Sequence, residues 1–143
     1  VGHESRANEA RSRASEAGAK TGSAGNRDRT WLLDDGPVEP ETLGQGSGLP
    51  PLVFSNSYMA LPDLGPRFLA AGASTFIGPN LPLFSRPARI FASYTYQALG
   101  EGWCAGAAVW RAAHACRREL GENHPAWLSY GIQGYGSLAL QYL

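Results

Sequence analysis

The sequence of 143 residues lacks both an excess of charge and a long hydrophobic run. Lysine and arginine together number 12, and so do aspartate and glutamate, so nothing in the charge balance points to nucleic acid or an acidic lipid surface as a partner. No apolar stretch approaches the roughly 20 residues that cross a bilayer. The first residues, VGHESRANEA, also lack the apolar core of a signal peptide. The sequence therefore predicts no association with a membrane.

Cysteine and lysine are scarce as well. Cys104 and Cys116 are too few for a disulfide framework, and twelve positions along one predicted helix would hold them about 18 Å apart, beyond the reach of a disulfide. A reducing cytoplasm is therefore the expected location. Lys20 stands alone against eleven arginines, which is typical of a protein from a GC-rich bacterial genome.

One long segment has no residues that could build a core. Residues 4–29 contain no leucine, isoleucine, valine or aromatic residue. Such a segment cannot bury enough apolar surface to offset the entropy lost on ordering. We therefore expect residues 1–30 to hold a flexible polar insert, and the folded part of the chain to span residues 31–143.

The folded part alternates strand-like and helix-like segments, which predicts an α/β fold. Two apolar runs without alternation, 51–56 and 73–78, are typical of buried strands. The order strand, helix, strand, two helices, strand predicts a mostly parallel sheet with helices on both faces. Three strands make a thin sheet with open edges, so we expect either further strands upstream, which would make this the C-terminal part of a larger domain, or a partner that covers the edge.

The boundaries of the individual elements follow from turn and cap signals. Gly72 is expected to end the first helix, and Ser85 is expected to cap the second, with Pro87 in its first turn. The predicted helices span Gly65–Ala71, Arg86–Leu99 and about 104–120, the third strand spans Trp127–Ile132, and a short strand at Trp31 leads through Asp-Asp-Gly into a second extended piece.

Two further residue sets have alternative interpretations. Cys104, His114, Cys116 and His124 fit no common zinc spacing, so packing of the cysteines and surface positions for the histidines are preferred over a metal site. The four tryptophans could form a ligand platform, but core or interface anchoring is the more common role of such residues. They are Trp31, Trp103, Trp110 and Trp127.

The ordered series of motifs resembles a CHAT domain, a member of the caspase- and separase-related peptidase clan that is often fused to tetratricopeptide repeats in bacteria. The resemblance covers residues 31–143 and, loosely, residues 1–3. The motifs that support it are LVFSNS, FLAAGAS, GASTFIG, FASYTYQALGEG, GAAVWRAAH and WLSYGIQGYGSL. It implies a caspase-like fold, a mostly parallel sheet with helices on both faces, and neither cofactor nor metal.

The resemblance also implies where a peptidase site would lie. The family has a His–Cys dyad at the carboxyl ends of two neighbouring strands. The VGH segment would supply the histidine as His3, and Ser57 occupies the position of the nucleophilic cysteine. Glu4 replaces a glycine whose backbone helps to form the oxyanion pocket, and Tyr58 begins an altered flank after the nucleophile position.

These changes predict a degenerate peptidase homologue that acts as a regulatory or protein-interaction module. A serine hydroxyl is a far weaker acid than a thiol, and Glu4 would place negative charge near an oxyanion. The expected partner is a protein or peptide, with tetratricopeptide repeats of the same full-length protein as one candidate.

The alternative is an active hydrolase that uses a Ser57–His3 pair, which requires Ser57 Oγ to lie within hydrogen-bond reach of a His3 ring nitrogen. An engineered Cys→Ser change would explain Ser57 but leaves Glu4 unexplained.

Overall fold

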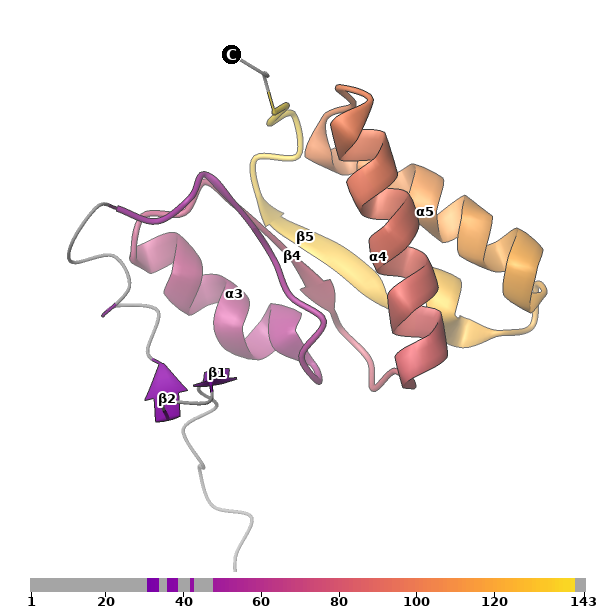
Figure 1. Ribbon diagram of the computed structural model, residues 1–143, viewed down its shortest axis with the longest axis horizontal. Coiled ribbons are helices and arrows are strands. Elements are labelled where there is room, and N and C mark those ends of the chain that lie inside the picture. Colours follow the sequence, from indigo (N-terminus) through magenta and orange to yellow (C-terminus); the bar gives the residue numbers. More distant parts are fainter. Residues whose placement is uncertain (1–30, 34–35, 39–41, 43–47, 141–143) are drawn as a thin grey trace, which may run out of the picture.

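The computed structural model describes residues 31–33, 36–38, 42 and 48–140 (Figure 1). The predicted insert at residues 1–30 lies outside the described residues. The strands are β1 (Trp31–Leu33), β2 (Gly36–Val38), β3 (Leu52–Phe54), β4 (Thr75–Pro79) and β5 (Tyr130–Gly134). The helices are α3 (Ala60–Ala70), α4 (Ser85–Gly100), α5 (Ala105–Leu120) and the short 3-10 helix η1 (Pro125–Leu128).

The main sheet has three strands in the order β3-β4-β5, and it confirms the predicted α/β fold. Strands β3 and β4 run parallel, with Leu52 opposite Thr75, as expected for a strand–helix–strand unit. Strand β5 runs antiparallel to β4, with Pro79 opposite Tyr130. A second, two-stranded sheet pairs β1 with β2 antiparallel and confirms the extended pieces on either side of Asp-Asp-Gly.

The antiparallel β5 corrects the prediction of a mostly parallel sheet. A single helix between two strands returns the chain to the edge of the sheet where the first strand began, so the second strand is parallel. Two helices lie between β4 and β5, and they pack against each other as an antiparallel pair (Figure 1). The chain therefore comes back to the edge where β4 ended, and β5 can only run in the opposite direction.

Helices cover both faces of the main sheet, as predicted. On one face, Val53 and Phe76 pack with Leu61, Leu64 and Phe68 of α3. On the other face, Ile77 and Tyr130 pack with residues of α4 and α5, which lie together on the opposite side of the strands from α3 (Figure 1). All five residues of β4 are buried, which explains why its sequence is apolar without alternation.

Helix α3 begins five residues earlier than the predicted Gly65. Its sequence holds Pro62 in the first turn, where the missing N–H would be unpaired in any case, and Pro66 inside the helix. The buried face of Leu61, Leu64 and Phe68 holds the helix against the sheet despite Pro66.

The predicted role of Gly72 at the end of α3 is confirmed. Gly72 has φ 109°, its N–H donates to Leu69 O, and the N–H of Ala73 donates to Phe68 O. This pair of hydrogen bonds is a Schellman motif. Gly102 ends α4 with the same pair of hydrogen bonds.

Two further predicted boundaries are wrong. Ser85 is the first residue of α4 rather than its cap; the cap position belongs to Phe84, whose carbonyl accepts from the N–H of Ala88. The third strand starts at Tyr130 instead of Trp127, because residues 125–128 form η1. The His124 ring accepts from the N–H of Ala126 and the Ser129 hydroxyl donates to Pro125 O, which together close that turn.

A stack of three aromatic rings joins the sheet to α4. The Tyr130 ring lies 3.8 Å from that of Phe91 and 5.8 Å from that of Phe54, and both pairs are nearly parallel. Phe91 is 1% exposed. The stack therefore connects the end of β3, the start of β5 and the middle of α4.

We expect Phe91→Ala to lower the free energy of unfolding by about 3–5 kcal/mol, because it removes the buried ring and leaves a cavity beside Tyr130. Phe84→Ala is the matched control. Phe84 is 84% exposed, so its removal is expected to change stability by less than about 0.5 kcal/mol. Urea unfolding of both variants measures the difference. Equal effects of the two substitutions would contradict the described core.

Candidate functional site

The loop after β3 lies at the edge where the parallel strands end. Residues 55–59 follow β3 directly, Asn80 follows β4, and β5 begins at the same edge because Tyr130 pairs with Pro79. In open α/β sheets, ligands bind outside the carboxyl ends of the strands. This carboxyl edge is therefore the candidate site, and it contains Ser57 and Tyr58 as predicted from the sequence.

Short hydrogen-bonded turns set the backbone around Ser57. The N–H of Ser55 donates to Ile77 O at 2.9 Å and extends the ladder between β3 and β4. The Ser55 hydroxyl then accepts the N–H of Ser57 at 3.1 Å, and Ser57 O accepts the N–H of Ala60 at 3.2 Å. Ser57 is thus held between the end of β3 and the first turn of α3.

Met59 adopts a left-handed conformation in this loop. Its φ is 48° and its ψ is 37°. In the described part of the chain, Met59 is the only non-glycine residue with a positive φ. A non-glycine residue in the left-handed region lowers the stability of the fold by about 1–3 kcal/mol. Such a conformation persists only where the surrounding structure fixes it. Burial of the neighbouring Ala60 and Leu61 at the start of α3 holds the turn.

The Ser57 side chain is exposed, and Tyr58 beside it is 65% exposed. Within the described ranges, no side chain forms a hydrogen bond with the Ser57 hydroxyl. His3 and Glu4, the other two residues that the resemblance assigns to the site, lie outside the described residues. The pairing of Ser57 with His3 and the effect of Glu4 therefore stay predictions.

Tyr130 and Asn56 connect this loop to the core, and neither was identified from the sequence. The Tyr130 hydroxyl donates to Asn56 Oδ1. Burial raises the pKa of Tyr130 well above its ordinary value, so the phenol stays protonated and remains a donor at every physiological pH. No local pattern could have connected Tyr130 with Asn56, because the two residues are 74 positions apart in the sequence.

The two cysteines, His114 and His124 make contacts that do not involve Ser57. Burial, with a smaller effect from Glu119, raises the pKa of Cys116 to about 11, so this thiol is protonated and unreactive near neutral pH. Cys104 stands at the cap position of α5. His114 is exposed and its ring contacts Trp110, while His124 closes η1. Across the described segments, no group of three or more potential metal ligands comes together.

The tryptophans depart from the core interpretation. Trp103 is 44% exposed and Trp110 is 63% exposed, so the core role is wrong for these two. Trp127 is half-buried, and its indole N–H donates to Glu122 O. The Trp31 side chain lies outside the described residues.

Large apolar side chains are exposed in the loops of the carboxyl edge. Tyr58 follows β3, Leu81 and Phe84 lie between β4 and α4, and Leu128 precedes β5; their exposed fractions are 65%, 44%, 84% and 61%. Scattered exposed apolar residues are common, but these four come from all three loops that meet at one edge. Exposed apolar side chains therefore occur in each of the three loops at the edge where Ser57 lies.

No family model, curated protein or solved structure matches the chain. The CHAT resemblance therefore rests on the motifs in the sequence. Among the described residues, no helix is long and apolar enough to cross a membrane.

We expect Ser55→Ala to speed hydrogen exchange at the Ser57 amide by about tenfold, because the substitution removes the acceptor of that N–H. Ser57→Ala is the control: it keeps the same N–H and the same acceptor, so exchange at residue 57 should stay unchanged. Residue-resolved exchange by NMR measures both variants. Unchanged exchange in Ser55→Ala would refute the hydrogen bond from the Ser57 N–H to the Ser55 hydroxyl.

Proposed function

We propose that the chain is a catalytically silent relative of CHAT peptidases that acts as a regulatory or protein-interaction module. The observation that supports this best is the position of Ser57. Its side chain is exposed directly after the parallel strand β3, in a loop held by Ser55 and the start of α3. A caspase-like site needs its nucleophile in a loop of this kind, and the side chain there is a hydroxyl instead of a thiol.

Replacing the thiol removes most of the chemistry. A cysteine has a pKa of about 8.5, and a nearby imidazolium lowers it further, so a thiolate forms easily. A serine hydroxyl needs a base that is well oriented by a third group. No described carboxylate or histidine forms a hydrogen bond with Ser57, and a glutamate in place of the family glycine at position 4 would oppose charge developing on an oxyanion.

The surroundings of Ser57 suit binding to another protein better than catalysis. Tyr58, Leu81, Phe84 and Leu128 expose apolar area in the three loops around this edge. Tyrosine and phenylalanine are enriched in the centres of protein interfaces, because they supply large contact areas at little cost in side-chain entropy. A peptide or protein partner, including repeats of the same full-length protein, would cover these side chains.

We expect a fluorophosphonate probe, which labels activated serines, to leave Ser57 of the full chain unlabelled. The hydroxyl would lack an oriented base and would react no faster than an ordinary serine. Intact-protein mass spectrometry, compared with Ser57→Ala and with Ser93→Ala on the exposed face of α4, measures this. Labelling of the wild-type chain that is lost only in Ser57→Ala would support the active Ser57–His3 hydrolase instead.

The same proposal predicts the result of restoring the family residues. In the full-length protein, the combined change Ser57→Cys and Glu4→Gly is expected to produce cleavage of the chain or of peptide substrates, which the wild type lacks. Ser57→Ala with Glu4→Gly is the control for cleavage that does not depend on the thiol. A double variant that folds, as judged by circular dichroism, but does not cleave would contradict the assignment of Ser57 to the nucleophile position.

A further inference from the structure

A groove runs along the outer surface of the α4–α5 pair, apart from the carboxyl edge. It consists of two hollows of about 450 and 440 Å³. His114 and Arg118, one turn apart on α5, line both hollows and connect them. We call this surface the α5 groove; it is lined at one end by Tyr94 and Gln97 of α4 and at the other by Gly121 and Glu122.

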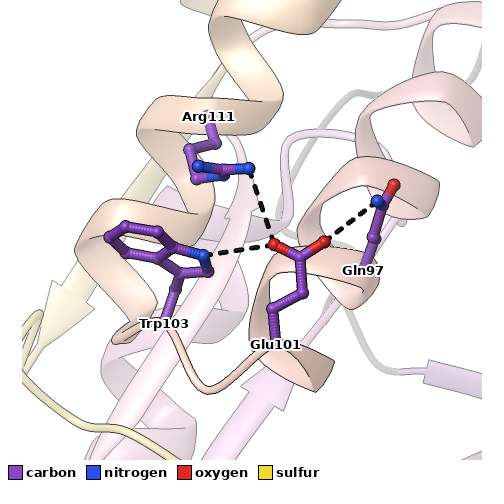
Figure 2. Close-up of polar contacts among 4 residues, drawn as sticks. All are labelled: Gln97, Glu101, Trp103 and Arg111. Carbon is purple, nitrogen blue, oxygen red and sulfur yellow. Dashed lines mark hydrogen bonds and ion pairs between the residues drawn. The ribbon is translucent and has the colours of Figure 1, made fainter.

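Figure 2 shows how one wall of the α5 groove is fixed. Glu101 accepts hydrogen bonds from Gln97 Nε2 at 3.0 Å and from Trp103 Nε1 at 3.2 Å, and it lies 3.5 Å from the guanidinium of Arg111. The Arg111 guanidinium also lies over the Trp103 ring, 4.8 Å from its centre. The charges of Glu101 and Arg111 therefore offset each other, and their side chains are ordered before any ligand arrives.

At the other end of the α5 groove, an arginine and a glutamate offset each other's charge in the same way. Arg117 Nη2 lies 2.7 Å from Glu122 Oε1, and its guanidinium lies 5.3 Å from the centre of the Trp127 ring. Arg118 differs from Arg111 and Arg117, because it forms no ion pair or hydrogen bond with any described residue. It is exposed and lines both hollows. Glu119 beside it accepts a hydrogen bond from the Tyr94 hydroxyl, so among the described residues Arg118 is the arginine of the α5 groove whose guanidinium has no carboxylate partner.

An aromatic platform lies beside that charge. The rings of Trp110 and His114 are 4.2 Å apart and tilted by 58°, and Trp110 is 63% exposed. An exposed tryptophan that is held against a second ring loses little freedom when a ligand covers it, and tryptophan and arginine are the residues most enriched at binding hot spots.

We propose that the α5 groove binds an acidic peptide segment of a partner protein. A carboxylate of the peptide would lie between Arg118 and His114, and an aromatic or apolar side chain next to it would cover Trp110. Charge complementarity supports this partner: a single free arginine suits one carboxylate. Nucleic acid fits less well, since its repeated phosphates need several free cations, whereas Glu101 and Glu122 line the same surface.

This inference is independent of the proposed role of Ser57, because the α5 groove contains none of the residues of the carboxyl edge. A partner could occupy the groove whether or not Ser57 is silent. The substitutions that test one site leave the other unchanged, so the two proposals can fail separately.

The test starts from a displayed library of random dodecapeptides that is selected on the immobilised full chain. We expect enrichment of peptides with aspartate or glutamate next to an aromatic residue. The best peptide, measured by fluorescence anisotropy, should bind Arg118→Ser at least about tenfold more weakly than the wild type, because a charge-assisted hydrogen bond is lost. Trp110→Ala should cause a similar loss. Both residues are exposed, so both variants should keep the wild-type circular dichroism spectrum and melting temperature.

Arg89→Ser is the matched control, since Arg89 is an exposed arginine of α4 outside both hollows. It should leave the affinity unchanged. The proposal is overturned if no acidic peptide is enriched, or if Arg89→Ser weakens binding as much as Arg118→Ser does. It is also overturned if a dT12 oligonucleotide binds more tightly than the peptide and loses its affinity in Arg118→Ser, which would identify a nucleic-acid surface.

Discussion

Tyr130 makes the contact on which the rest of the described structure depends. Its ring is buried between Phe54 at the end of β3 and Phe91 on α4, and its hydroxyl donates to Asn56 in the loop before Ser57. One side chain therefore ties together the two outer strands of the sheet, the helix pair and the carboxyl edge. The donor must remain protonated, and burial ensures this by raising the pKa of Tyr130. The position of the Ser57 loop thus depends on the packing of the hydrophobic core.

The parts of the fold that local patterns determine could be predicted from the sequence. The uninterrupted apolar run at β4 follows from burial on both faces, whereas Leu52 and Phe54 of the edge strand β3 are only half-buried. Gly72 ends α3 where a positive φ is needed. The direction of β5 could not be predicted, since it depends on how α4 and α5 pack in space. The early start of α3 was missed because Pro62 and Pro66 are typical of loops, and the packing of the apolar face of α3 outweighs that preference.

The candidate site could be predicted only in outline. The resemblance assigned Ser57 to the carboxyl end of a strand, and Ser57 lies directly after β3. The contacts from Ser55 to the Ser57 amide and from Tyr130 to Asn56 depend on side-chain geometry and on distant parts of the chain, which no local pattern records. The α5 groove escaped prediction for a similar reason. From the sequence alone, the arginines of α5 look like ordinary solvent-exposed residues of a helix. Only the ion pairs of Arg111 with Glu101 and of Arg117 with Glu122 show that Arg118 differs from the other two.

The return of the chain to the edge where β4 ended also bears on how the protein folds. Strands β4 and β5 are far apart in sequence, and closing so long a loop in an unfolded chain costs entropy before any pairing compensates for it. The α4–α5 hairpin is built from contacts between neighbouring segments, which form quickly. Once the hairpin has formed, the ends of the chain that lead to Pro79 and Tyr130 are held close together. Pairing of β5 with β4 then requires the closure of a much shorter loop. We therefore expect the helix pair to form before β5 joins the sheet.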